Sequence, residues 1–549
     1  MAKRKSHKYI FVVGGVMSGV GKGVTTASIG TILQSKGYKV SLMKADPYLN
    51  VDAGTMNPTE HGEVYVMDSG LETDQDMGNY ERFLDIDLPN ENYMTNGMVF
   101  KYVIDKERAL GYKGQCVEPL YHITEEILRR IKASATKTES EITIVEIGGT
   151  VGEYQNAIFL EAARVLKQKN PRDVMFVMVS YLPVPRIIGE MKTKPTQNAV
   201  RQLNSYGINP DVIIARSEVP IDKKRKEKIS NATGVDVADV ISAPDIKSIY
   251  EIPINFENDG LSTRILSHFG IRPKQKDLVQ WRAMVKKLQE PKDTVRIGIV
   301  GKYFDTGDFV LSDVYISVIE ALKFSGGKEG VGVDLTWINS KDIEKGVFDI
   351  KELSKFHGIL VPGGFGSNGI DGILQTIKYA RENNIPYFGL CYGMQLMVIE
   401  FARNVLKLAG AHTTEVDPET KYPIVDIMPE QKELVAKGQY GASMRLGAYP
   451  AVLSKGTISA KAYGTEEISE RHRHRYEINP EYIEQIEKAG LVFSGKSPNG
   501  KLMEIAELPV SKHPFFLAVQ FHPEFKARPL SPHPLFTAFI KAVKNNKGK

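Results

Sequence analysis

A cysteine framed by glycines is the residue of this chain whose surroundings most strongly suggest chemistry. It lies in Gly389-Leu390-Cys391-Tyr392-Gly393-Met394-Gln395. The apolar residues 385–388 predict a strand before it, and residues 396–403 predict a helix after it. A reactive residue at a glycine-flanked strand-to-helix turn is a nucleophile elbow, here with Cys in place of Ser. The helix N-terminus favours the nucleophilic thiolate, whereas a lone cysteine without this frame is usually inert core.

A thiolate of this kind needs a base, and the base needs a group that orients it. Residues 515–525 predict a strand, so His522 and Glu524 point to one face, where Glu524 can fix the tautomer of His522. Residues 358–361 predict another strand, which runs into Pro362-Gly363-Gly364. Such a turn presents bare backbone N–H groups, as an oxyanion hole requires.

A glycine loop near the start of the chain predicts a phosphate site. Strand-like residues 9–13 run into Gly14-Gly15-Val16-Met17-Ser18-Gly19-Val20-Gly21-Lys22-Gly23, and a helix is expected to follow through about Lys36. Loop N–H groups, the helix N-terminus and Lys22 would face the anion. The segment departs from the P-loop pattern twice, since Val16 replaces the first Gly and Gly23 replaces the metal-binding Ser or Thr.

Because position 23 has no hydroxyl group, metal ligands should come from elsewhere in the chain. Residues 72–76 predict an acidic loop that contains Asp76, although Glu72 there also fits a solvated turn. Residues 142–150 predict a strand that ends on Glu146, and a carboxylate in that place faces the ligand crevice of a parallel sheet. Carboxylate oxygens suit Mg²⁺ with its phosphates, and Lys44 supplies a second cation nearby.

Length and composition set limits on the kind of protein. The 549 residues suggest two or more domains, and the formal net charge of +5 is too small to imply a nucleic-acid surface. Two cysteines, Cys116 and Cys391, exclude a disulfide framework and suit a reducing compartment. The basic start leads into too few apolar residues for a signal peptide, and no apolar run is long enough to cross a membrane. We therefore expect a cytoplasmic protein without nucleic-acid or membrane partners.

Alternating strands and helices predict an α/β fold with two domains. The first is a P-loop-like, doubly wound parallel sheet over residues 1–270. Residues 271–294 form a polar linker, and the strand at residues 295–300 begins a second α/β domain that ends at residue 549. Within the first domain, a loop with two lysines at residues 192–197 is either solvated or able to hold a second polyphosphate.

The second half of the chain resembles the class I glutamine amidotransferases, through Cys391, His522, Glu524 and the Pro-Gly-Gly turn. The resemblance implies that glutamine is hydrolysed through a thioester and that ammonia is released. It assigns the ends of glutamine to Glu415 and to Arg475, which closes the run Arg471-His472-Arg473-His474-Arg475. Without the resemblance, this run would indicate a solvated patch or a weak metal site. The glutamine contacts implied are Gly364, Tyr392, Gly393, Met394, Gln395, Glu415 and Arg475.

The full chain resembles the CTP synthase family. Beyond the loop at Lys22 and the triad, the motifs are Lys44-Ala45-Asp46-Pro47-Tyr48, Gly54-Thr55-Met56, His61-Gly62-Glu63-Val64, Glu146-Ile147-Gly148-Gly149-Thr150-Val151-Gly152 and Lys192-Thr193-Lys194-Pro195-Thr196-Gln197. The resemblance implies that ATP with Mg²⁺ phosphorylates the 4-oxygen of UTP and that ammonia displaces this phosphate to give CTP, the last step of de novo CTP synthesis.

The resemblance also distributes roles in the first domain. Lys22 and Lys44 would neutralise charge on the transferred phosphate, and Asp76 and Glu146 would hold Mg²⁺. Nucleotide contacts would come from Ser18, Gly19, Val20, Gly21, Gly23, Lys192, Thr193, Lys194, Pro195, Thr196, Gln197 and Lys228, with Asp245 and Ile246 near the adenine. Two departures stand out: Glu153-Tyr154-Gln155 replaces an acid–aliphatic–acid motif that contacts inhibitory CTP, and Pro244 replaces a frequent Lys.

The family further implies a homotetramer, activation by GTP, inhibition by CTP and, in some members, filaments. Two other functions remain open at this point. One is glutamine-dependent amidation of another acceptor, such as a cobyrinic-acid-type carboxylate, against which the segment at residues 192–197 argues. The other is a nucleotide switch or filament scaffold with a vestigial amidotransferase half, against which the intact Cys391, His522 and Glu524 argue.

Overall fold

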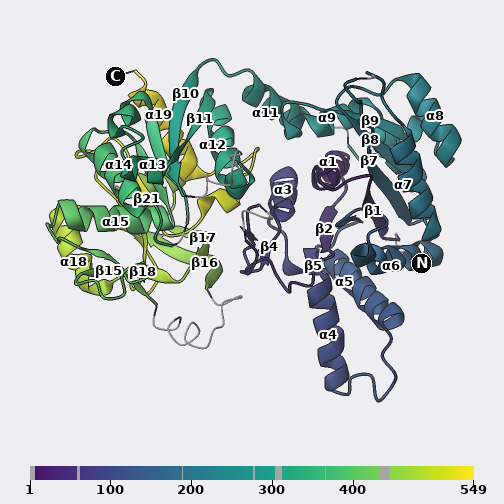
Figure 1. Ribbon diagram of the computed structural model, residues 1–549, viewed down its shortest axis with the longest axis horizontal. Helices are drawn as coiled ribbons and strands as arrows, with labels where there is room; N and C mark the ends of the chain where they lie inside the picture. The colour runs from purple at the N-terminus through teal and green to yellow at the C-terminus, as the bar shows by residue number, and fades with distance from the viewer. Residues whose placement is uncertain are drawn as a thin grey trace. The chain divides into compact units, whose positions relative to one another are not determined.

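The computed structural model divides the chain into two compact units (Figure 1). It describes residues 6–57, 62–187, 189–275, 278–302, 312–364, 366–428, 431 and 444–548, so His61 of the sequence motif lies outside the described residues. The first unit holds Met1–Ala53 and Asp76–Val285, and the second holds Gly54–Gln75 and Lys286–Lys549. Over the described ranges, no helix has both the length and the apolar character that a membrane span needs.

The first unit is built on a seven-stranded sheet in which every neighbouring pair is parallel. Its strands are almost entirely buried, as expected where helices cover both faces of a sheet. In spatial order the strands are β5 (Tyr93–Thr95), β2 (Val40–Asp46), β6 (Ile142–Ile147), β1 (Lys8–Gly15), β7 (Val174–Tyr181), β8 (Val212–Ser217) and β9 (Val240–Pro244).

Helices pack on both faces of this sheet, which confirms the doubly wound arrangement predicted from the sequence. Phe11 and Val13 of β1 face a core shared with α4 (Asn96–Arg108), α5 (Thr124–Lys137), α6 (Ala157–Lys169), α7 (Lys194–Ser205) and α8 (Lys223–Thr233). The opposite face receives α1 (Lys22–Ser35), which also contacts α9 (Ile252–Asn258) and α10 (Leu261–His268). The phosphate loop therefore joins the central strand to a buried helix.

The second unit contains a nine-stranded sheet that is half parallel and half antiparallel. Strands β11 (Gly332–Asn339), β10 (Thr294–Gly301), β12 (Gly358–Val361), β13 (Tyr387–Leu390) and β21 (Phe516–Val519) are parallel. Strands β20 (Met503–Glu507), β19 (Val492–Lys496), β16 (Arg445–Leu453) and β17 (Glu467–His474) continue the sheet in antiparallel pairs.

The helices of the second unit also lie in two groups. Helix α15 (Tyr392–Asn404) packs with α14 (Ile370–Glu382) in the main core. Helix α12 (Ile316–Glu329) contacts α19 (Pro534–Asn546) instead. A small sheet of β14 (His412–Thr413), β15 (Pro423–Ile427) and β18 (Tyr476–Ile478) adds to the α15 side. The second α/β domain predicted from the sequence is thus present.

Residues 54–75 differ from the sequence expectation, which placed them in the first domain. They form the hairpin β3 (Tyr65–Val66) and β4 (Glu72–Thr73), and they cluster with the second unit. The acidic loop expected at residues 72–76 is also wrong. Glu72 lies in β4, and Asp76 lies in the first turn of α3 (Gln75–Leu84). Each unit is therefore made of two separate stretches of the sequence.

Candidate functional sites

Cys391 occupies the tight turn between β13 and α15. Its φ of 48° and ψ of −99° lie in a region that side chains rarely adopt, and its N–H donates to the carbonyl of Val519 at 2.7 Å. The flanking glycines are required by close approach. A Cβ at Gly393 would lie 2.5 Å from the carbonyl oxygen of Val361, and one at Gly389 would lie 2.8 Å from the backbone of Gly393. The nucleophile elbow predicted from the sequence is therefore formed.

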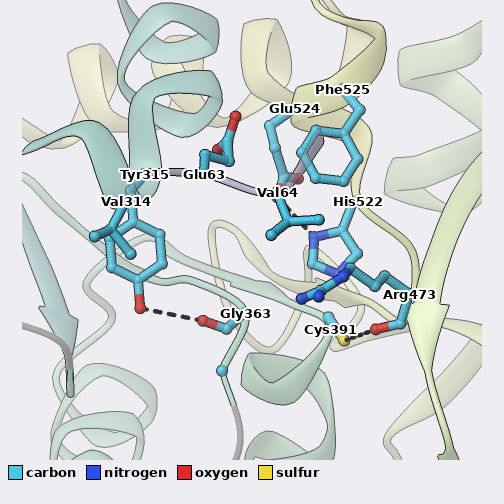
Figure 2. A pocket seen from close by; sticks show the side chains of 11 residues that line it. Glu63, Val64, Val314, Tyr315, Gly363, Cys391, Arg473, His522, Glu524 and Phe525 are labelled. Atoms are coloured by element: carbon cyan, nitrogen blue, oxygen red, sulfur yellow. Dashed lines mark hydrogen bonds and ion pairs between the residues drawn. The ribbon is translucent and has the colours of Figure 1, made fainter. Parts of the chain in front are cut away.

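His522 and Glu524 form the pair that the sequence predicted, but the backbone that brings them together is not the predicted strand. The strand β21 ends at Val519, and Glu524 lies in a short 3₁₀ turn, Pro523–Lys526, so the expectation of one strand through both residues is wrong. The turn still places Nδ1 of His522 2.7 Å from Oε1 of Glu524. Figure 2 shows the imidazole between Glu524 and Cys391.

The charges around His522 favour its imidazolium form. Burial alone would lower the pKa of His522, but Glu524 and Cys391 raise it to about 10. Both side chains are largely buried, so the charges act through protein more than through water. His522 therefore carries a proton in the cavity that it shares with Cys391. A nitrogen that leaves a substrate at Cys391 could accept this proton.

The glycine turn lies against these two residues in a cavity of about 80 Å³. A Cβ on Gly363 would lie 2.8 Å from Cε1 of His522 and 3.7 Å from Cβ of Cys391, so only glycine fits there. The hydroxyl of Tyr315 donates to the carbonyl of Gly363 at 3.2 Å (Figure 2). The cavity is lined by Glu63, Val64, Val314, Tyr315, Gly363, Gly364, Cys391, Arg473, His522, Glu524 and Phe525.

Gln520 is a neighbour of the sulfur that the sequence interpretation missed. Its Nε2 donates to Sγ of Cys391 at 3.7 Å, and its Oε1 accepts from Nε2 of Gln395 at 3.4 Å. Gln395, expected to contact glutamine, is almost fully buried inside α15 and also donates to the carbonyl of Tyr476 at 3.1 Å. Met394 is fully buried as well, so these two side chains support the turn from behind.

A second group of residues lies where the ends of glutamine were expected. Oε1 of Glu415 accepts from the N–H of Gly366 at 2.9 Å, and Arg475 helps to offset the rise that burial gives the pKa of Glu415. Lys302, which the sequence did not single out, donates to the carbonyl of Gly366 and lies 4.4 Å from the ring centre of Tyr392. Burial lowers the pKa of Lys302 to about 8.

The alternating Arg and His residues of β17 point to opposite sides of the strand. Nδ1 of His472 lies 2.9 Å from Nε2 of His474, and burial followed by the charge of Arg445 places the pKa of both imidazoles well below the usual range. Arg471 is fully buried on the other side. Among the described residues, no group of three or more His, Cys, Asp or Glu could hold a metal. The burial of Arg471, His472 and His474 is not typical of a solvated patch. The two interpretations that this run would suggest without the family resemblance, a solvated patch or a weak metal site, therefore do not fit the structure.

The phosphate loop of the first unit has the backbone shape that a glycine loop needs. Gly19 and Gly21 have φ values of 68° and 90°, and Val16 has a φ of 80°, so a β-branched residue adopts a conformation suited to glycine. Gly23 is explained by packing, because a Cβ there would lie 2.0 Å from Oδ1 of Asp76. The carboxylate of Asp76 thus occupies the space next to position 23 that a larger side chain would need.

The predicted cations and carboxylates of the first unit meet in one buried cluster. Nζ of Lys44 donates to Oε1 of Glu146 at 2.8 Å and to Oδ2 of Asp76. Burial opposes the charge of Lys44, but these two carboxylates hold its pKa well above the ordinary value. Burial also lowers the pKa of Lys22, and attraction to Glu146 only partly offsets it. The charge of Lys22 is therefore less fully compensated than that of Lys44.

The donor set of this cluster fits Mg²⁺. Asp76 and Glu146 offer hard carboxylate oxygens from α3 and β6, and Mg²⁺ usually binds through one or two carboxylates together with substrate phosphates. The cluster does not form a protein-only cage, in keeping with the finding that the described residues hold no group of three metal-binding side chains. Asp46, fully buried beside Lys44 at 3.8 Å, was not predicted as a site residue.

A cavity of about 170 Å³ lies beside the loop and includes the residues expected near adenine. Gly21 and Thr25 line it together with Asp245 and Ile246. Asp245 accepts from Arg216 at 2.9 Å, which fixes the loop after β9. Arg216, a lining residue without a sequence motif, was missed.

The segment at residues 192–197 forms the start of α7 and is not merely solvated. Thr196 is fully buried and accepts from Ser180 at 2.8 Å, and Nε2 of Gln197 donates to Oγ1 of Thr193 at 3.2 Å. Lys192 donates to Oε2 of Glu190 at 2.8 Å and lowers the pKa of Glu190, to which Arg225 and Lys228 also contribute.

Other residues predicted to bind nucleotides lie on the surface or in a neighbouring turn. Ser18 is exposed, and so is Tyr154, at 97%. Glu153 is half-buried beside Gly149, and its Oε2 accepts from Nε2 of Gln155 at 3.1 Å. None of these positions belongs to the buried cluster around Lys44.

Comparison with known proteins relates both halves of the chain to described families. Residues 8–271 match the family described as CTP synthase N-terminus, and residues 310–542 match glutamine amidotransferase class-I. A CTP synthase of Pyrococcus abyssi (strain GE5 / Orsay) is 50% identical over 542 residues, which cover 98% of each chain. A CTP synthase of Methanocaldococcus jannaschii is 48% identical and covers 99% of this chain and 100% of the relative. The solved glutaminase domain of Trypanosoma brucei CTPS with bound acivicin is 37% identical, with a TM-score of 0.41, over 46% of this chain and 94% of that chain.

Proposed function

Because the chain belongs to the CTP synthase family, we propose that it aminates UTP to CTP with ATP and with ammonia taken from glutamine. The observation that carries the proposal is the presence of two complementary sites in one chain. One unit holds a thiol, an imidazolium and a glycine turn in a cavity. The other holds a glycine loop with two buried lysines and two carboxylates. In this proposal residues 1–270 and 295–549 are the two functional domains, except that residues 54–75 belong to the second unit.

In the glutamine half-reaction, Sγ of Cys391 attacks the amide carbon of glutamine, and the N–H groups of the Gly363–Gly364 turn receive the developing oxyanion. The C–N bond breaks as His522 gives its proton to the nitrogen, which leaves as ammonia. His522 then takes a proton from water, and the hydroxide opens the thioester to glutamate and the thiolate. Glu415 and Arg475 hold the α-amino and α-carboxylate ends, with support from Gly364 and the residues 392–395.

In the synthetase half-reaction, the loop at residues 18–23 binds the triphosphate of ATP, and Lys22 and Lys44 neutralise charge as the γ-phosphoryl group moves to O4 of UTP. Ammonia then displaces phosphate at C4. Asp76 and Glu146 would hold Mg²⁺, which supplies further charge neutralisation when bound. The residues 192–197 and Lys228 bind UTP, and Asp245 and Ile246 lie by the adenine of ATP.

Regulation and assembly follow from the same family assignment. We propose GTP as an activator, CTP as an inhibitor that reaches residues 153–155, and a homotetramer as the assembled form. The first unit exposes apolar side chains in α4 and in the segment that follows it, including Ile104, Leu110, Leu120 and Tyr121. Exposed apolar side chains of this kind suit contact between subunits.

One assay tests the proposal. The purified protein is supplied with UTP, ATP, Mg²⁺ and glutamine, and CTP formation is followed by absorbance, with and without GTP. We expect CTP and glutamate in equal amounts, and CTP again when ammonium salts replace glutamine. Absence of CTP under both nitrogen sources would contradict the proposed function.

A further inference from the structure

A segment from the N-terminal part of the chain closes one side of the glutamine cavity. Residues 62–75, here called the wall segment, belong to the second unit. Its Glu63 and Val64 line the same cavity as Cys391 and His522 (Figure 2). Glu63 and Val64 thus form part of the cavity lining, and displacement of the wall segment would remove both side chains from it.

Two contacts with the C-terminal half hold the middle of the wall segment. Arg471 of β17, with no exposed side-chain surface, donates to the hydroxyl of Tyr65 at 2.8 Å and forms an ion pair with Asp68. Burial would raise the pKa of Asp68, but Arg471 lowers it below the ordinary value. A Cβ on Gly447 would lie 2.4 Å from the backbone nitrogen of Gly70, so the two backbones touch. These contacts hold the middle of the segment.

The start of the wall segment is held by a helix. The carboxylate of Glu63 accepts from the backbone N–H of Ser317 at 3.1 Å and from its hydroxyl. Ser317 lies in the first turn of α12, where backbone N–H groups lack partners inside the helix and the dipole favours a negative charge. Glu63 is therefore fixed at the rim of the cavity.

An ion pair with β17 holds the end of the wall segment. Nε of Arg473 lies 2.8 Å from Oε1 of Glu72, whose side chain is 1% exposed. Within the described residues, Oε2 of Glu72 has no hydrogen-bond partner, so Arg473 is its principal compensation. Arg473 also lines the cavity, and its carbonyl oxygen lies 3.9 Å from Sγ of Cys391. One residue thus contacts the nucleophile with its backbone and the wall segment with its side chain.

We propose that the ion pair between Arg473 and Glu72 keeps the wall segment closed over the cavity, so that ammonia released at Cys391 is retained for amination. Arg473 acts as a positioning residue for the wall. The inference rests on the proposed function. Its physical basis is that ammonia escaping into neutral water is protonated, and ammonium has no lone pair with which to attack an activated pyrimidine. If the wall segment opened, glutamine would still be hydrolysed, but ammonia would escape and less CTP would form for each glutamine consumed.

The test measures glutamate and CTP in the same reaction. For the wild-type protein we expect about one glutamate per CTP. Arg473→Met and Glu72→Gln should raise this ratio at least threefold, while CTP formation from added ammonium stays within twofold of wild type. Arg473→Lys, which keeps a cation, should raise it less than Arg473→Met. The double variant Arg473→Met/Glu72→Gln should resemble the worse single variant, because both substitutions remove one contact.

A matched ion pair elsewhere in the same unit provides the control. A guanidinium nitrogen of Arg381 lies 2.8 Å from Oε1 of Glu400. The arginine side chain is 16% exposed in both ion pairs, and the glutamate side chain is 0% exposed in Glu400 and 1% exposed in Glu72. Neither Arg381 nor Glu400 lines the cavity. Arg381→Met should therefore lower the melting temperature as Arg473→Met does and leave the glutamate to CTP ratio unchanged.

The outcomes separate the inference from the function on which it rests. An unchanged ratio in a folded Arg473→Met protein, or an equal rise in Arg381→Met, would overturn the inference while leaving CTP synthesis intact. Loss of glutamine hydrolysis without a change in the ratio would also overturn it, since Arg473 would then serve catalysis. A wild-type protein that makes no CTP from either nitrogen source would instead overturn the proposed function.

Discussion

The two candidate centres manage buried charge in opposite ways. In the second unit, His522 already lies between Glu524 and Cys391 in the order that the chemistry requires, and its pKa is raised to about 10. In the first unit, Lys44 is neutralised by Asp76 and Glu146, while burial lowers the pKa of Lys22. From this comparison we infer that the protein alone preorganises the centre at Cys391, and we propose that an anionic ligand completes the centre at Lys22.

Removal of the nucleophile should produce the largest and most selective effect. Cys391→Ala should lower glutamine-dependent CTP formation by about 10⁴-fold or more, since no thioester can form. CTP formation from ammonium should stay close to wild type because the first unit is untouched. Parallel CTP assays with the two nitrogen sources measure both. Equal loss with ammonium would mean that Cys391 is structural.

Removal of the less compensated lysine, Lys22, should affect both nitrogen sources alike. Lys22→Met keeps the length of the side chain but removes the charge that faces the phosphates, and we expect a loss of about 10³-fold with glutamine and with ammonium. Thioester formation at Cys391, followed with labelled glutamine, should persist. A variant that loses only the glutamine-dependent reaction would contradict the assignment of the two centres.

Restoring the standard P-loop residue should damage the phosphate centre. Gly23→Ser places a Cβ 2.0 Å from Oδ1 of Asp76, so the carboxylate must move away from its place beside Lys44. We expect about 10²-fold lower CTP formation with either nitrogen source, since small displacements at a reacting centre cost this much. Gly23→Ala should cause a similar loss. Retained or improved activity of Gly23→Ser would show that Asp76 is not needed in its place.

The smallest effect is a shift in the titration of His522. The pKa of His522 is raised above its unfolded value, so its contribution to stability is complete below about pH 6.5 and is lost as the pH rises through about 10. Cys391→Ala and Glu524→Gln should each lower this pKa, which NMR of labelled histidine side chains measures. A titration near pH 6.5 in the wild-type protein would contradict the preorganised charge order.

Much of both centres could be predicted because local sequence determines them. The elbow at Cys391 and the loop at Lys22 each consist of adjacent residues whose glycines are required by backbone conformation or close packing. The pairing of His522 with Glu524 was predicted for the wrong reason, since a 3₁₀ turn and not a strand brings them together.

What could not be predicted depends on contacts between distant segments. Gln520 and Lys302 belong to no motif, and only folding brings Gln520 to Cys391 and Lys302 to Gly366. The same holds for the wall segment, because Glu72 and Arg473 are 401 positions apart and their pairing has no local signal. Val16 is a further case, since a β-branched residue at a φ of 80° contradicts local preference.

Transfer of labelled nitrogen tests the central claim most directly. The protein is supplied with UTP, ATP, Mg²⁺ and glutamine labelled with ¹⁵N in its side-chain amide, in the presence of unlabelled ammonium, and the CTP is analysed by mass spectrometry. If the cavity at Cys391 delivers ammonia for amination, the CTP carries ¹⁵N in excess of the label found in free ammonium. CTP whose label matches that of the free ammonium would contradict the account.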